Sequence, residues 1–173
     1  MKLKELNLKE IKDQQPLFRR VNLLYHEQIP KPLHRLNPRT IKGKAWWDRQ
    51  RQKAYRKNNY CCHACGEAVR VLDAHEVYDV LLCQGRTVFV EIVALCKDCH
   101  NTIHIGFTEK TKGQKEVDRL NTRRGKLFQQ YIQGAWKVPW SKWRLVFEGV
   151  EYEPKFKSID EWYEYYEGKE KKE

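Results

Sequence analysis

The sequence lacks any apolar run long enough to cross a bilayer, and the residues after Met1 lack the apolar core of a secretion signal. We therefore expect a protein of the reducing cytoplasm that does not contact membranes. The sequence also lacks the repeated heptads of a coiled coil, which favours a monomer. Acidic residues are in deficit, because 23 Asp and Glu stand against 34 Lys and Arg, a formal net charge of +11. Such an excess of positive charge predicts a polyanionic partner.

The positive charge is concentrated in two segments. Residues 1–60 hold 16 Lys and Arg against 5 Asp and Glu, and residues 111–145 hold 9 against 2. Between them, residues 61–110 hold only 4 against 7, and the last segment, 146–173, is also acidic, with 5 against 9. A mildly acidic central stretch is therefore flanked by basic ones, which suits a metal site that is held against phosphates.

Cysteine occurs six times, and four of the six residues form two Cys-x-x-Cys pairs about thirty residues apart. Three disulfides would suit a secreted chain, whereas paired Cys-x-x-Cys motifs in a reducing compartment predict one zinc site with four thiolate ligands. The alternative is a group of buried thiols that bind no metal. The predicted ligands are Cys62, Cys65, Cys96 and Cys99. Cys61 and Cys83 are left as ordinary thiols of the core or the surface.

The segment between the two cysteine pairs predicts a β-hairpin. Val69 to Val80 alternates and is rich in β-branched residues, residues 81–86 contain a turn, and Thr87 to Leu95 predicts the returning strand. A short helix is expected from about Asp98. It would carry His100 and His104, whose spacing of four residues places both rings on one helix face.

The flanking segments define three regions. Residues 1–42 contain four prolines and predict a basic, irregular arm, which either is a flexible tail or wraps the core or tracks nucleic acid. A zinc domain is expected over 43–106, opening with a helix from Gly43 to about Lys57. Residues 107–173 predict a basic amphipathic helix, an aromatic cluster and an acidic last helix that pack on the core.

Further elements are expected in this last region. They are a helix from Gln114 to Ile132, a cluster of Trp136, Pro139, Trp140 and Trp143 that serves core packing, a strand from Arg144 to Tyr152, and a helix opened by a capping box at Ser158 and Glu161.

Basic side chains on the two predicted helices are candidates for contact with phosphates. The alternative is that they form a charged helix face that is exposed to solvent and binds nothing. These candidates are Arg49, Arg51, Lys53, Arg56, Lys57, Lys115, Arg119, Arg123, Arg124 and Lys126.

The order of a Cys-x-x-Cys-Gly motif, a hairpin with a histidine, and Leu-Cys-x-x-Cys-His-x-x-x-His resembles the HNH nucleases, a family with a zinc-stabilised ββα-metal fold. The resemblance covers about residues 44–106, and the segment from Trp46 to Cys62 also resembles HNH-domain proteins of bacteria and phages. It implies that the four cysteines hold structural Zn²⁺. It further implies that the hairpin and helix hold one catalytic divalent ion, Mg²⁺, Mn²⁺, Ni²⁺ or Zn²⁺, over the scissile phosphate.

The residues that match the family's site differ from its usual pattern. His75 matches the metal ligand best, which leaves Glu76 at the position of the general-base histidine. In the other register His75 is the base, and the ligand position falls on an alanine, which cannot bind a metal. Since neighbouring strand residues point to opposite faces, one ligand and one base are more sensible here than two ligands.

The remaining matches complete the implied metal site. Glu91 stands at the position of the family's central asparagine, and His100 and His104 match its helix histidines. The ligand set implied by the resemblance is therefore His75, Glu91, His100 and His104, because a divalent ion accepts imidazole nitrogens and carboxylate oxygens.

We accordingly predict an α+β fold, in which a small zinc-stapled β-hairpin and helix of the ββα-metal type carry flanking helices and a basic N-terminal arm. The predicted function is that of an HNH-like endonuclease, a hydrolase that cleaves phosphodiester bonds in DNA with weak or no base readout; RNA is left open as a substrate. The alternative is a noncatalytic, zinc-stabilised module that binds nucleic acid or protein.

Overall fold

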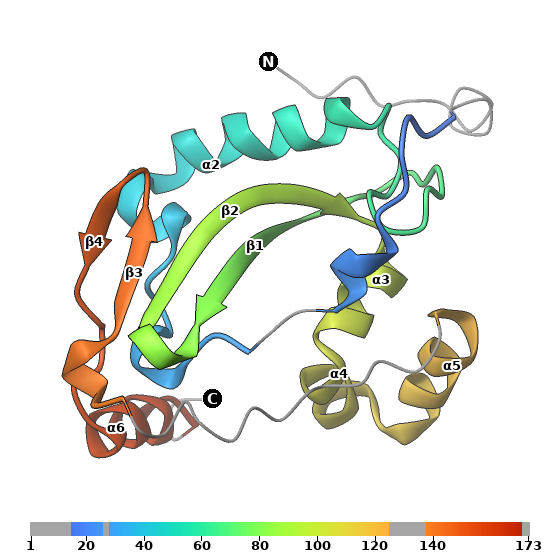
Figure 1. The fold of residues 1–173 in the computed structure, drawn as a ribbon. Coiled ribbons are helices and arrows are strands. Elements are labelled where there is room, and N and C mark those ends of the chain that lie inside the picture. Colours follow the sequence, from blue (N-terminus) through green and yellow to red (C-terminus); the bar gives the residue numbers. More distant parts are fainter. Residues whose placement is uncertain (1–14, 26–27, 125–137, 171–173) are drawn as a thin grey trace. The chain divides into compact units, whose positions relative to one another are not determined.

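The protein is an α+β structure with a four-stranded sheet and five α-helices in the part that its computed structural model describes, residues 15–25, 28–124 and 138–170 (Figure 1). The α+β class predicted from the sequence is thus confirmed. The helices are α2 (Pro38–Lys57), α3 (Lys97–Ile103), α4 (Ile105–Lys112), α5 (Gln114–Arg124) and α6 (Ile159–Glu170). The strands are β1 (Asp73–Leu81), β2 (Arg86–Leu95), β3 (Arg144–Phe147) and β4 (Val150–Tyr152). Short 3₁₀ helices lie at Val21–Leu24, Lys31–Leu33, Leu82–Gln84 and Trp140–Lys142.

The chain forms two compact units, each built from segments that are separated in the sequence. The cysteine unit comprises residues 15–25, 48–77 and 92–124 of the described chain, and the tryptophan unit comprises residues 28–47, 78–91 and 138–170. Strands β1 and β2 each contribute residues to both units. The division expected at residues 42 and 106 follows the order of the sequence, and it stays a prediction.

The cysteine unit is packed around the residues of the two Cys-x-x-Cys pairs. Its buried core combines three cysteines with aliphatic side chains from the 3₁₀ helix, β2 and α3. These buried residues are Leu23, Leu24, Cys62, Ala64, Val93, Leu95, Cys96, Cys99 and Ile103. Leu23 and Leu24 come from the predicted arm, so this part of the arm packs against the core, as one of the two interpretations of residues 1–42 expects.

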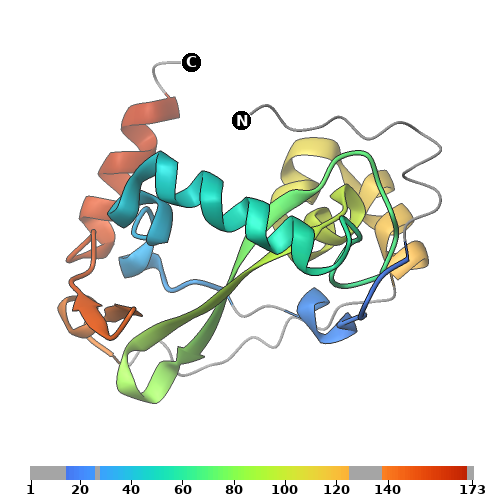
Figure 2. The same cartoon turned by 90° about the horizontal axis from the view of Figure 1, so that it is seen from above.

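The tryptophan unit has its own core around Trp143, which is almost fully buried with Leu33 and Leu145. Here β2 pairs in parallel with β3 through Arg86–Arg144 to Val88–Val146, and β3 pairs antiparallel with β4. The other neighbour of β2 is β1, and Figure 2 shows these two strands as a long, twisted hairpin. Of the predicted aromatic cluster, Trp143 is buried as expected, whereas Trp140 is half-buried and Pro139 is exposed. Trp136 lies outside the described residues.

Helix α2 begins with a reciprocal cap. The Asn37 side chain accepts a hydrogen bond from the Thr40 amide at 2.9 Å, while the Thr40 hydroxyl accepts one from the Asn37 amide at 3.0 Å. These bonds satisfy amides that an uncapped helix start leaves without partners. The helix is interrupted at Gly43, whose φ of +80° is not helical. The helix expected from Gly43 to about Lys57 is therefore the part of α2 after this interruption.

Several predicted elements are present with different bounds. β1 begins at Asp73 rather than Val69, because Ala68 forms a bridge with Cys61 and so belongs to the turn around the first cysteine pair. The single strand expected over 144–152 is wrong, since Glu148 and Gly149 both have positive φ and reverse the chain between β3 and β4. The cap predicted at Ser158 is confirmed in one of its two bonds, because the Ser158 hydroxyl accepts the Glu161 amide at 3.2 Å, while the Glu161 carboxylate accepts the Lys157 amide at 2.7 Å.

Two further findings bear on the sequence predictions. Helix α5 is described from Gln114 to Arg124, and the predicted continuation to Ile132 lies outside the described residues. No helix in the described ranges has the length and apolar character required to cross a membrane.

Candidate metal centres

The first cysteine pair lies in a tight turn that the backbone holds together. The Cys62 amide donates to the Glu67 carbonyl and the Gly66 amide donates to the Cys62 carbonyl, both at 2.9 Å. Gly66 has a φ of +80°, and a Cβ there would lie 2.6 Å from Nε of Arg19. Glycine is therefore required at this position both by the backbone conformation and by the neighbouring arginine.

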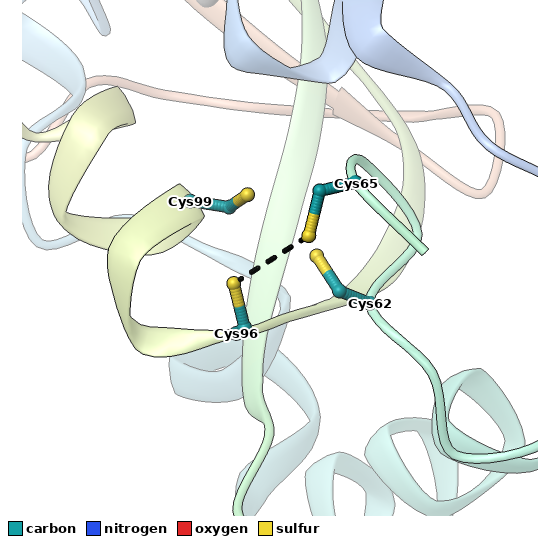
Figure 3. Close-up of side chains that lie close together, drawn as sticks. All are labelled: Cys62, Cys65, Cys96 and Cys99. Carbon is teal, nitrogen blue, oxygen red and sulfur yellow. Dashed lines mark hydrogen bonds between the residues drawn. The ribbon is translucent and has the colours of Figure 1, made fainter. Parts of the chain in front are cut away.

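The second cysteine pair spans the end of β2 and the start of α3. Cys96 is the residue before α3, and its carbonyl accepts the His100 amide at 3.0 Å. The start of the helix points Cys96 and Cys99 toward the turn that carries Cys62 and Cys65 (Figure 3).

The four sulfur atoms lie within 4.8 Å of one another, and those of Cys65 and Cys96 are 3.8 Å apart. Four sulfurs bound to one Zn²⁺ at about 2.3 Å in a tetrahedron lie about 3.8 Å from each other. The cluster therefore fits a structural metal such as zinc. Hydrogen bonds from Cys65, Cys96 and Cys99 lower the pKa of the Cys62 thiol, because the other three thiols stabilise a thiolate there.

A buried asparagine ties the N-terminal segment to this turn. The Asn58 carboxamide oxygen accepts the Leu17 and Phe18 amides at 2.7 and 3.0 Å, and its nitrogen donates to the Phe18 carbonyl at 3.1 Å. The same nitrogen lies 3.3 Å from the Cys62 carbonyl. Asn58 is fully buried, so these bonds fix the segment before the first 3₁₀ helix against the metal-binding turn.

Three histidines form a second cluster in the same unit. His75 lies on β1, His100 lies on α3, and His104 lies at the junction of α3 and α4. One ring nitrogen from each lies within 4.8 Å of the other two, and the ring centroids are 4.9 to 5.4 Å apart. In a tetrahedron, nitrogens that bind one ion at about 2.1 Å lie about 3.4 Å apart, so small ring rotations that move these nitrogens by roughly an ångström would close the site. The cluster can therefore hold a metal ion.

The two helix histidines are not on one continuous helix as predicted. The His104 amide donates to the His100 carbonyl and ends α3, while the His104 carbonyl accepts the Thr108 amide and begins α4. The Thr108 hydroxyl donates to the Asn101 carbonyl at 3.0 Å, which holds the two helices at this bend. His75 is buried and His104 is exposed, so the cluster opens to solvent on the His104 side.

Asp73 is a residue of this site that the sequence analysis did not identify. Its carboxylate lies 2.9 Å from Nδ1 of His100 and 3.4 Å from Nζ of Lys97. Asp73 and His75 are two residues apart on β1, so their side chains share one face of the strand. The Asp-x-His spacing on a predicted strand indicates that Asp73 shares the strand face of His75, but it does not specify the contact with His100.

The two glutamates assigned to the site have different positions. Glu76 is half-buried and follows His75 on β1, which directs its side chain to the opposite face of the strand. Glu91 is half-buried on β2, in the part of that strand assigned to the tryptophan unit. The three-histidine cluster does not include either carboxylate. Their roles as base and as ligand stay predictions.

The basic residues predicted to contact phosphates fall into three groups. Arg49, Lys53, Arg56, Lys57 and Lys115 are exposed. Two are paired with carboxylates: Arg51 donates to Asp48 at 2.8 Å, and Arg119 donates to Asp98 and Glu116 at 2.7 and 2.8 Å. Arg123 and Arg124 belong to α5, and Lys126 lies outside the described residues.

Comparisons of this chain with protein-family models, with curated proteins and with solved structures find no match. Function is therefore inferred from the residues of the four-cysteine and three-histidine clusters.

Proposed function

We propose that this protein is a metal-dependent, HNH-like endonuclease that hydrolyses phosphodiester bonds in DNA. The observation that carries the proposal is the convergence of His75 from β1, His100 from α3 and His104 from the junction of α3 and α4, in the same unit as a four-cysteine cluster. One centre has only thiolate ligands and is buried in the core, which suits structural zinc. The other has imidazole ligands and opens to solvent, which suits an ion that meets a substrate.

The chain's own residues have separate tasks in this proposal. The three histidines would hold the divalent ion, which supplies stabilisation of the negative charge that develops on the phosphate during hydrolysis. Arg49, Lys53 and Arg56 recur at helical spacing on α2 and are exposed, so one helix face presents positive charge to the DNA backbone. Contacts of this kind attract the phosphates and carry no base preference.

A proton acceptor is also needed to activate the attacking water. If His75 binds the ion, its neighbour Glu76 is the remaining candidate from the sequence, although it would need a local twist of β1 to reach the same face. If His75 is instead the base, His100 and His104 keep the ion. Separate substitutions of the two residues distinguish these assignments.

The second candidate function is a noncatalytic nucleic-acid-binding module stabilised by zinc. The exposed basic face of α2 favours it, since phosphate contacts do not require cleavage. A binding module would keep a salt-dependent affinity for DNA and would show no hydrolysis with any metal.

The proposal is tested with supercoiled plasmid incubated with zinc-loaded protein and Mg²⁺, Mn²⁺, Ni²⁺ or Zn²⁺. We expect nicked or linear DNA with at least one metal, abolished by a chelator and reduced at least 100-fold in His104→Ala. The matched control is Glu109→Ala, an exposed residue on α4, which should cleave as the unmodified protein does.

Parallel reactions with His75→Ala and Glu76→Ala assign the base. Loss in both variants supports His75 as ligand and Glu76 as base, whereas loss only in His75→Ala supports His75 as base. Absence of cleavage with all four metals, in folded protein that retains one zinc per chain and binds DNA, would reject the nuclease and leave the binding module.

A further inference from the structure

We propose that Asp73 is a positioning residue for the histidine metal centre, which sets the tautomer and the orientation of the His100 ring. The inference rests on the proposed metal site and adds a residue that the resemblance to HNH nucleases does not assign. Asp73 is not one of the three residues that could hold the ion, which are His75, His100 and His104. Its carboxylate instead contacts one ligand from outside.

The geometry supports a hydrogen bond with a defined direction. Oδ2 of Asp73 lies 2.9 Å from Nδ1 of His100, a short distance for a bond between a ring N–H and a carboxylate. A carboxylate only accepts hydrogen bonds, so Nδ1 of His100 carries the proton. The neutral ring then has its lone pair on Nε2, which is the nitrogen that remains to bind an ion.

The surroundings hold both groups in place. The side chains of Asp73 and His100 are only 29% and 25% exposed, so water competes weakly for the bond. Asp73 lies on β1 beside His75, and His100 lies in the first turn of α3, where its amide is bonded to the Cys96 carbonyl. The Asp73–His100 bond therefore links the strand that carries one ligand to the helix that carries another. Outer carboxylates of this type raise the basicity of a metal-binding histidine and commonly change metal affinity 10- to 100-fold.

The first test needs no metal at the histidine centre. Long-range ¹H–¹⁵N NMR on zinc-loaded protein reports the tautomer of His100, and we expect the Nδ1–H form in the unmodified protein and in Asp73→Asn, whose amide oxygen still accepts. In Asp73→Ala the ring should populate Nε2–H. Observation of the Nε2–H form in the unmodified protein would overturn the proposal, and this result does not depend on whether any variant folds.

The second test measures binding of Co²⁺ to the histidine centre by its visible absorption, with the cysteine centre filled with zinc. Intense sulfur-to-cobalt bands would reveal any exchange into the cysteine centre. We expect the Kd to rise 10- to 100-fold in Asp73→Ala and to rise less in Asp73→Asn. The control is Lys97→Ala, which removes the exposed partner of Asp73 and should leave the Kd within about twofold.

The outcomes separate this inference from the proposed function. A Kd in Asp73→Ala equal to that of the unmodified protein would overturn the positioning role while leaving the metal centre intact. Complete loss of Co²⁺ binding in both Asp73→Asn and Asp73→Ala, together with a cobalt spectrum of the unmodified protein that indicates a carboxylate ligand, would make Asp73 a direct ligand. This result would also overturn the positioning role. Failure of the unmodified protein to bind Co²⁺ at the histidines would instead remove the metal site on which the proposed function depends.

Discussion

At the scale of single residues, the buried Asn58 and the half-buried His34 each have defined hydrogen-bond partners. Asn58 bonds to backbone groups of the N-terminal segment and of the turn at Cys62, and His34 bridges a loop and α6. Buried polar groups of this kind stabilise a fold through the cost of leaving their partners unpaired rather than through large net bond energies. Each therefore gives a prediction about stability that is independent of catalysis.

Asn58→Ala should destabilise the cysteine unit by about 2–4 kcal/mol, because the Leu17 and Phe18 amides would lose a buried acceptor. Urea unfolding of the zinc-loaded protein measures the change. The exposed Asn22→Ala is the control and should remain within about 0.5 kcal/mol of the unmodified protein. A similar small effect in both variants would show that Asn58 does not hold the segment in place.

His34 predicts a loss of stability in acid. Burial lowers the pKa of His34, the Ile29 carbonyl partly opposes this shift, and Lys31 adds to it. Since the folded pKa lies below the unfolded value of 6.5, the unfolded state takes up the proton first, and stability falls as the pH decreases through and below about 6.5. His34→Gln, which does not titrate, should lose less stability between pH 7.5 and 5.5 in urea unfolding. Identical pH dependence in both proteins would contradict this role.

At the scale of elements, ion pairs with carboxylates determine which basic side chains are available to the phosphates of the proposed DNA substrate. Arg119 makes a bidentate contact with Asp98, the second of the two residues between Cys96 and Cys99. It also contacts Glu116 on its own helix. The guanidinium therefore connects α5 to the helix that carries the second cysteine pair. Lys115, one turn earlier on α5, is exposed and available for phosphates.

These two positions form a matched pair. Arg119→Ala should lower stability by about 1 kcal/mol or less, since solvent screens a pair that is this exposed, and should alter DNA affinity little. Lys115→Ala should leave stability unchanged and weaken DNA binding, with a shallower dependence on salt. Thermal unfolding and binding titrations at two salt concentrations measure both effects. If Arg119→Ala instead weakened DNA binding and Lys115→Ala lowered stability, Arg119 would again be a candidate for phosphate contact.

The elements themselves could largely be predicted from the sequence, and the contacts between them could not. Alternation predicted the hairpin, and the two Cys-x-x-Cys pairs predicted the cluster that the structure brings together. The break at His104 escaped prediction because the cross-bond from Thr108 to Asn101 forms only when the two helices bend. The contact of Asp73 with His100 joins residues 27 positions apart, and local pattern alone does not specify such a pair.

At the scale of the whole molecule, the cysteine unit has a small core that includes its own metal ligands, whereas the tryptophan unit has a core of aromatic and aliphatic side chains. Thiolates gathered in an apolar core are costly without a cation, so folding of the cysteine unit should be coupled to zinc. The tryptophan unit contains none of the four cysteines.

Removal of zinc with a strong chelator should therefore destabilise the cysteine unit first. We expect the melting temperature to fall by more than about 10 °C, because a loss of roughly 5 kcal/mol shifts a protein of this size by at least that amount. Hydrogen exchange should accelerate at Val93 and Leu95 before it does at Leu145. Uniform acceleration in both units, or an unchanged melting temperature, would contradict a structural role for the metal.

The measurement that tests the central claim most directly is the number of metal ions bound per chain. Equilibrium dialysis against Mn²⁺ or Co²⁺, followed by elemental analysis, should find one zinc that resists exchange and one further ion that exchanges readily. The zinc should persist in His104→Ala, while the second ion should be lost. A single ion per chain in the unmodified protein, or a second ion that His104→Ala binds as tightly, would contradict the existence of a separate histidine metal centre.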